Sequence, residues 1–167
     1  MKARTQFAVS KNVVVLLALF LLLAGSHSFM ALAQNTPSAK PEFEFKTAWV
    51  EINGKQFKVE LADNWDLRAQ GLQFRTELCE DCGMLFQFER TRLIAMWMKN
   101  TLIPLDVAFF EQGGKIIDIK QMKPLDLTSV PSSAPVLYAL EMNDGWFAKN
   151  GVKEGDNIRV FFSQPDM

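Results

Sequence analysis

The chain has 167 residues, a formal net charge of −1 at pH 7, two cysteines and a single histidine. This length suits one globular domain with a short extension. Acidic and basic residues nearly balance, so there is no excess of positive charge for the phosphates of DNA or RNA, and nucleic-acid binding is excluded.

The first 33 residues have the pattern of a secretory signal peptide. Lys2, Arg4 and Lys11 give a positive start, residues 13–24 are all apolar, and Ala31-Leu32-Ala33 places small residues where signal peptidase cleaves. We therefore expect cleavage after Ala33 and a periplasmic or secreted domain. The apolar run is shorter than the ~20 residues that cross a bilayer. Extended to Ala33 it can just span one, so an uncleaved membrane anchor is the alternative.

Cleavage would change the chemistry left in the domain. His27, the only histidine, would leave with the signal peptide, which excludes Ser–His and Cys–His nucleophiles and imidazole metal ligands. Fifteen basic residues would remain against 19 acidic ones, so the net charge would move from −1 to −4. We expect no metal and no other cofactor, and membrane contact only during export or through an uncleaved anchor.

The start of the domain carries the clearest local pattern. Residues 34–45 read as a flexible leader, because the stretch to Pro41 is polar and contains two prolines. Across 46–62, apolar and polar residues alternate on both sides of Asn53-Gly54, a pair that favours a type I′ turn, and this predicts a β-hairpin.

A short helix is expected next, at about 64–74. Asp63 can cap it, and Trp65, Ala69 and Leu72 share one face.

Short strands dominate the rest of the chain. We expect them at 84–88, 93–99, 105–110, 116–122, 136–142 and 157–162, with a loop at 124–135, a short helix at 145–150 and a frayed tail at 163–167. Many short strands with little helix predict one α+β domain over residues 46–162. Its core would be a predominantly antiparallel, barrel-like sheet with one definite short helix.

Several motifs in this domain occur in a fixed order. They are Gly71-Leu72-x-x-Arg75, Gly83-Met84-Leu85-Phe86-x-Phe88, Trp97-Met98-Lys99-Asn100-Thr101-x-x-Pro104-Leu105-Asp106, Glu141, Gly145 and Gly151-x-x-x-Gly155-Asp156. The sequence from 46 to 162 thereby resembles the family known as domain of unknown function 192. The resemblance implies a compact β-rich fold and no assigned reaction. Gln73, where relatives usually carry Met, and the pair Cys79 and Cys82 depart from the family pattern.

Residues 97–106 are the strongest candidate for a ligand site. A cation, an amide, a hydroxyl and a carboxylate occur there beside a tryptophan, which suits a small polar ligand. Two further charged groups can join from other elements. The hypothetical site consists of Arg75, Trp97, Lys99, Asn100, Asp106 and Glu141. The alternative is a buried hydrogen-bond network in which these groups only satisfy the backbone of loops.

Catalysis has weaker support. Asp106 and Glu141 could serve as the acid and base of a hydrolase, provided that their separation suits it. A serine nucleophile with Lys99 as base is conceivable, but no serine lies in a recognisable nucleophile setting. We assign no catalytic residue.

Cys79-Glu80-Asp81-Cys82 places two cysteines three positions apart. In an oxidising compartment we expect them to form a structural disulfide. A thiol–disulfide function is the alternative, although Glu80 and Asp81 would raise the pKa of a catalytic thiol.

Met96 and Met98 share the strand face opposite Trp97, where their sulfurs could bind Cu(I), but packing in the core is the better interpretation. The sequence thus predicts a non-catalytic envelope module that binds a small polar ligand or an envelope protein. The hydrolase and the thiol–disulfide protein are the alternatives.

Overall fold

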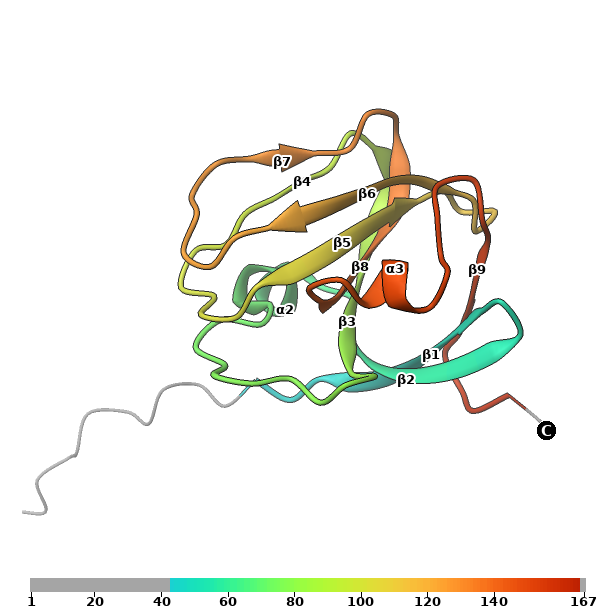
Figure 1. Ribbon diagram of the computed structural model, residues 1–167, viewed down its shortest axis with the longest axis horizontal. Helices are drawn as coiled ribbons and strands as arrows, with labels where there is room; N and C mark the ends of the chain where they lie inside the picture. Colours follow the sequence, from blue (N-terminus) through green and yellow to red (C-terminus); the bar gives the residue numbers. More distant parts are fainter. Residues whose placement is uncertain (1–42, 166–167) are drawn as a thin grey trace, which may run out of the picture. The chain divides into compact units, whose positions relative to one another are not determined.

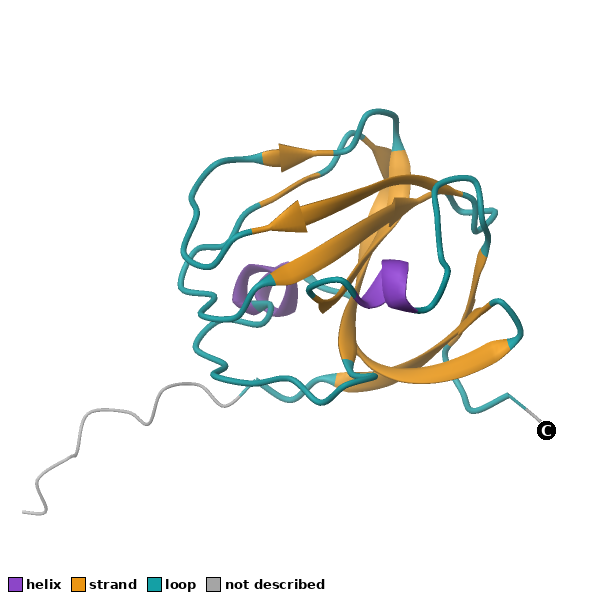
Figure 2. Cartoon of the chain, viewed as in Figure 1, coloured by secondary structure: helices purple, strands orange, loops and turns teal. Residues whose placement is uncertain are grey.

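The computed structural model describes residues 43–165, and the expected signal peptide lies outside them. Most of this part of the chain is β-structure (Figures 1 and 2). The elements are β1 (Lys46–Ile52), β2 (Lys55–Ala62), α2 (Trp65–Gln70), β3 (Gly83–Arg92), β4 (Ala95–Met96), β5 (Leu105–Phe110), β6 (Ile116–Met122), β7 (Val130–Pro131), β8 (Val136–Asn143), α3 (Trp146–Lys149) and β9 (Ile158–Phe161).

Seven strands form one curled sheet in the order β6-β5-β8-β3-β2-β1-β9. Every neighbouring pair is antiparallel except β2 and β3, which run parallel. The two ends of the sheet approach each other, because Lys115, beside β6, bridges to Asn157, beside β9. The expected α+β fold with a barrel-like sheet is therefore confirmed (Figure 2).

The predicted hairpin at 46–62 is present as β1 and β2. Asn53 and Gly54 both adopt left-handed backbone angles, with φ of 51° and 75°. A type I′ turn requires positive φ at both central positions, and this residue pair provides it at low cost.

The helix at 64–74 differs from the prediction in its cap, its length and its buried face. Asn64 is the N-cap, since its side-chain oxygen accepts the Leu67 N–H at 3.0 Å, so the assignment to Asp63 was wrong. The helix ends at Gln70 because Gly71 turns into positive φ. Trp65, expected on the packed face, is 74 % exposed, and Leu67 is buried instead.

The strand expected at 93–99 is only two residues long. β4 pairs with β7, a second short strand inside the segment expected to be a loop. Side chains nevertheless alternate between exposed and buried positions beyond the short strand: Met98 is buried, whereas Trp97 and Lys99 are exposed.

The sheet separates two apolar clusters. The first cluster lies inside the curl and includes Leu85, Leu140 and Trp146 of α3. The second cluster lies on the other face of β3, β5 and β8, where Leu67 and Leu72 of the α2 region pack against the sheet. Phe43 and Phe45, placed by sequence in the leader, also pack against this second cluster.

Among residues 43–165 no helix has the length and apolar character needed to cross a membrane.

Candidate functional site

The carboxyl group of Glu141 is the most unusual polar group of the domain. Glu141 lies on β8 directly opposite Met84 of β3 and Val107 of β5, so its side chain enters the second apolar cluster. The residue is 4 % exposed, and burial raises the pKa of its carboxyl group to about 8. The group is thus neutral at pH 7, and a neutral carboxyl can donate one hydrogen bond and accept others.

Nothing in residues 43–165 forms a hydrogen bond or an ion pair with this carboxyl group, and burial is the sole cause of its raised pKa. Each fully enclosed side-chain nitrogen or oxygen in the same part of the chain does have a partner. It follows that the Glu141 oxygens are not fully enclosed. They open onto a neighbouring cavity, described next, where a ligand atom or a water molecule can reach them.

That cavity has a volume of about 30 Å³. Its walls come from the end of α2, from β3, from β8 and from the segment after β4, and they include Gly71, Leu72, Phe86, Trp97, Lys99 and Glu141. A cavity of this size has room for one or two waters, or for one functional group of a larger molecule. The ring of Phe86 approaches Gly71 so closely that an added Cβ would lie 3.4 Å from it.

Trp97 and Lys99 form the outer rim of the cavity. Trp97 is 55 % exposed, and the Lys99 ammonium lies 5.5 Å from the centre of its indole ring. Leu102, Leu125 and Leu127 are also exposed. They belong to segments near the rim in the chain, because the backbone around 98–101 is hydrogen-bonded to that of 125–126.

The loops around the rim hold unusual backbone conformations. Phe74, Asn100 and Leu125 have φ of 64°, 56° and 60°, a region that large side chains rarely adopt. The Phe74 N–H donates to the Asn100 carbonyl at 2.8 Å, and the Leu125 N–H donates to the Thr101 carbonyl at 3.0 Å. Asn adopts this conformation readily, but Phe74 and Leu125 each cost roughly 1–3 kcal/mol, and residues of this kind concentrate at binding and active sites.

Of the six residues predicted for the site, the structure brings Trp97, Lys99 and Glu141 to one cavity. Asn100 supports the loop behind them, since its amide donates to the Gln73 side chain at 3.0 Å. Thr101, which the site prediction omitted, also lines the cavity.

Arg75 and Asp106 lie elsewhere. Arg75 forms an ion pair with Glu60 of β2. Asp106 accepts the Gly145 N–H at 2.9 Å, and burial raises the pKa of its carboxyl group despite that hydrogen bond. These two residues fit the alternative interpretation, in which polar groups of the motif stabilise the fold.

Asp106 and Glu141 point to opposite faces of the sheet. Asp106 of β5 is paired with Met142 of β8, whereas Glu141 is paired with Val107. Because consecutive residues of a strand alternate between faces, the two carboxyl groups are separated by the sheet itself. The arrangement provides no acid–base pair for a hydrolase.

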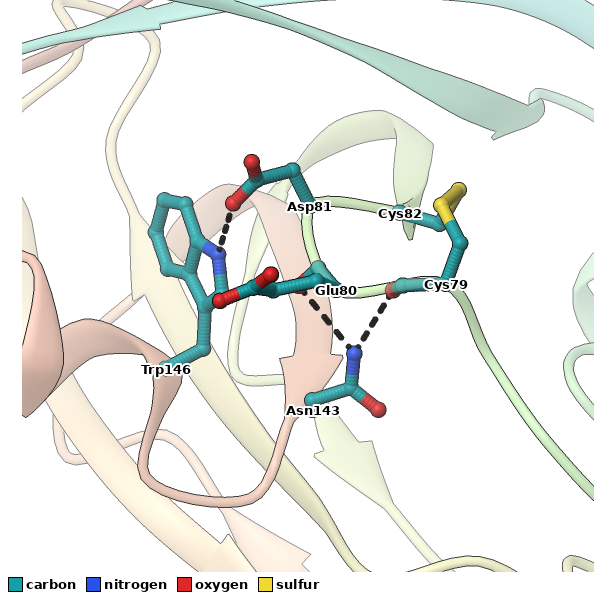
Figure 3. The surroundings of a disulfide bond; sticks show 6 residues. All are labelled: Cys79, Glu80, Asp81, Cys82, Asn143 and Trp146. Carbon is teal, nitrogen blue, oxygen red and sulfur yellow. Dashed lines mark hydrogen bonds between the residues drawn. A yellow bond between two sulfur atoms is a disulfide. The ribbon is translucent and has the colours of Figure 1, made fainter.

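Cys79 and Cys82 form a disulfide in the loop before β3 (Figure 3). Residues 43–165 contain no cluster of three or more His, Cys, Asp or Glu side chains that could hold a metal ion. Met98 is buried in the second apolar cluster and Met96 packs against it, as core packing requires.

Sequence reasoning missed Phe86 and Gly71 as cavity residues. Both occur in the motifs that carry the family resemblance, so a signal was present, but apolar and glycine positions of a motif look the same whether they form a core or a cavity wall.

Comparison with known proteins identifies the family of the chain and agrees with its fold. The model of the DUF192 family, described as an uncharacterised ACR family, matches residues 48–160. A crystal structure from Sinorhizobium meliloti 1021, described as a proposed transcription regulator, has 34 % sequence identity and a TM-score of 0.66, and covers 73 % of this chain and 98 % of its own.

A second crystal structure, of a protein of unknown function from Novosphingobium aromaticivorans DSM 12444, has 32 % identity and a TM-score of 0.63. It covers 75 % of this chain and 94 % of its own. No curated protein matches significantly. The chain belongs to the DUF192 family, the domain of unknown function 192.

Proposed function

We propose that this chain is an exported, non-catalytic binding module that takes one end of a small polar molecule into the Glu141 cavity. The observation that carries the proposal is a buried carboxyl group with no partner among residues 43–165, open to a cavity. Buried polar groups are nearly always hydrogen-bonded, because leaving one unpaired costs about 1–3 kcal/mol. A ligand group that bonds to Glu141 would remove this cost.

The geometry restricts the ligand. The cavity admits a single functional group, and a neutral carboxyl pairs best with a group that both donates and accepts, such as a hydroxyl or a carboxamide. The remainder of the molecule would lie on the rim, where the Trp97 ring offers a flat apolar surface and Lys99 a positive charge. Hydroxylated rings such as sugars have this combination of a flat body and polar ends.

Thermal denaturation of the protein with a panel of sugars and small amides tests the proposal. A ligand that binds only the folded state stabilises it by about 2.7 kcal/mol at a hundredfold excess over Kd. The shift should vanish in Trp97→Ala but remain in Trp65→Ala, a matched control because Trp65 is also an exposed tryptophan and is absent from the cavity.

Substitutions at Glu141 test whether the ligand bonds to this carboxyl group. Glu141→Gln keeps a group that donates and accepts and should retain binding, whereas Glu141→Leu should abolish it. In the unchanged protein, affinity should fall as pH rises above about 8, because the ionised carboxylate can no longer donate. Equal binding by the leucine variant would show that the ligand does not reach this group.

A protein partner from the envelope is the second candidate, and the exposed side chains of Leu102, Leu125 and Leu127 favour it. The transcription role suggested for the Sinorhizobium relative is not carried over. The acidic residues of this chain offset its basic ones, so its sequence has no excess of positive charge for DNA.

A further inference from the structure

The loop that contains Cys79 and Cys82 is a feature that the proposed binding site does not use. In Figure 3 the disulfide projects to one side of this loop, while the side chains of Glu80 and Asp81 extend to the other side, toward Trp146. Cys79 is exposed and Cys82 is half-buried. Cys79 is therefore the more accessible residue of the two.

The loop is anchored by contacts that do not involve the disulfide. The Asn143 amide donates to the carbonyls of Cys79 and Glu80, at 2.8 and 3.2 Å. The Trp146 indole N–H donates to the Asp81 carboxylate at 3.0 Å. Lys149 forms an ion pair with Glu80. These contacts hold Cys79, Glu80 and Asp81, and the Cys82 N–H donates to the Cys79 carbonyl at 3.1 Å. Because the closed loop is also very short, the disulfide adds little constraint, and the loop should keep its position when the bond is broken.

The same contacts change the electrostatics expected from the sequence. Two acidic neighbours disfavour a thiolate, but Glu80 is paired with Lys149 and Asp81 is hydrogen-bonded to Trp146, both on the side away from the sulfurs. Lys149 offsets the charge of Glu80, whereas Asp81 keeps its charge, because a hydrogen bond from a neutral indole does not neutralise a carboxylate.

Both cysteines lie in the wall of a groove with a volume of about 420 Å³. This volume falls within the range of pockets that hold small molecules, and it exceeds the Glu141 cavity many times over. Two cations and two carboxylates share the groove with the apolar side chain of Leu78, and these charged residues are Lys58, Glu60, Arg75 and Glu77. A molecule bound here would be in contact with the disulfide.

We propose that Cys79–Cys82 is an exchangeable disulfide that oxidises a cysteine-bearing molecule bound in this groove. A substrate thiolate attacks Cys79 Sγ, forming a mixed disulfide, and the electron pair of the broken bond leaves on Cys82 Sγ as a thiolate. A second substrate thiolate then attacks the substrate sulfur of the mixed disulfide and releases Cys79. The substrate dithiol loses two electrons and two protons, the protein disulfide gains the two electrons, and the protons pass through solvent to the released thiolates of Cys79 and Cys82. Reoxidation requires a disulfide oxidant, such as oxidised glutathione.

The first experiment incubates the oxidised, purified full-length protein with a peptide that carries two cysteines, or with reduced glutathione. Mass spectrometry follows peptide oxidation, and near-ultraviolet circular dichroism follows tertiary structure. We expect one peptide disulfide per protein and an unchanged spectrum. A faster reaction with the peptide assigns a protein substrate and a faster reaction with glutathione assigns a small thiol. Either result supports exchange. A disulfide that is reduced only after urea unfolds the protein would overturn the proposal.

The second experiment uses Cys82→Ser, which leaves Cys79 without a resolving thiol. With a peptide disulfide as the probe, this variant should accumulate a mixed disulfide on Cys79. Cys79→Ser is the matched control and should react at least tenfold more slowly, because Cys82 is half-buried. Equal rates for the two variants, or no adduct with a folded Cys82→Ser protein, would refute the assignment of Cys79 as the attacked sulfur.

Discussion

Replacing Glu141 by Gln should make the domain more stable at alkaline pH and leave it nearly unchanged at acidic pH. Gln has the shape of a protonated Glu but cannot ionise. In the folded protein the carboxyl pKa is about 8, against an ordinary value of 4.5, because burial penalises the charge. The unfolded chain has lost its proton between these two pH values, whereas the folded protein still holds it.

The sign and the size of the effect follow from this difference. Between pH 4.5 and about 8 the folded state binds one proton more, so stability falls as pH rises, by about 1.4 kcal/mol per unit. The contribution is fully present below the unfolded pKa and is lost by about pH 8. The loss over the whole interval is on the order of 5 kcal/mol as an upper limit.

Urea denaturation of both proteins at several pH values between 4.5 and 8.5 measures the effect. The free-energy difference between variant and parent should start near zero and grow with pH until it reaches a plateau. Subtracting the unfolding free energy of the parent from that of the variant at each pH cancels the contributions of other titrating groups. These include Asp106, whose pKa is also raised by burial. Glu111→Gln, at an exposed turn, controls for removal of one charge. A difference that stays flat across the series would refute the claim that this carboxyl group is buried and unpaired.

Three further substitutions and one control, Gly113→Ala, test the contacts that stabilise the fold. Gly83→Ala should lower the free energy of unfolding by about 1–3 kcal/mol, because its Cβ would lie 2.4 Å from the Glu141 carbonyl oxygen. Gly113→Ala, with open space around it, should have little effect in the same urea titration. Asp106→Ala should cost about 1–3 kcal/mol in thermal unfolding by leaving the Gly145 N–H unpaired, and a smaller loss would mean that water replaces the carboxylate. Asn64→Ala removes the cap of α2 and should cost about 1 kcal/mol, and a variant as stable as its parent would contradict the assigned cap.

Local patterns were predictable from the sequence wherever neighbouring residues determine the backbone. Asn53-Gly54 specifies its turn by itself, and the alternation around Trp97 placed Met98 in the core even though the expected strand is only two residues long. Helix α2 was less predictable, because the pattern of apolar residues continues to Leu72 although the helix ends where Gly71 turns into positive φ.

For the candidate site, the sequence did not reveal which face of the sheet each side chain occupies. The chemistry of Asp106 and Glu141 looked equivalent in the sequence, and the order of strands in the sheet separates them. Such an order depends on non-local pairing, including the parallel pair β2–β3 that no local pattern indicates. Trp97 and Lys99 were predictable as neighbours, since they are two positions apart on exposed backbone.

The bridge between Lys115 and Asn157 also affects when the domain can fold during synthesis. Strand β9 (Ile158–Phe161) pairs with the first strand of the domain, and the residues just before it meet the β5–β6 turn at the far end of the sheet. A chain that emerges N-terminus first therefore cannot complete the sheet until residues through Phe161 are free. Removing β9 should leave β1 unpaired at its outer edge and open to pairing with other chains.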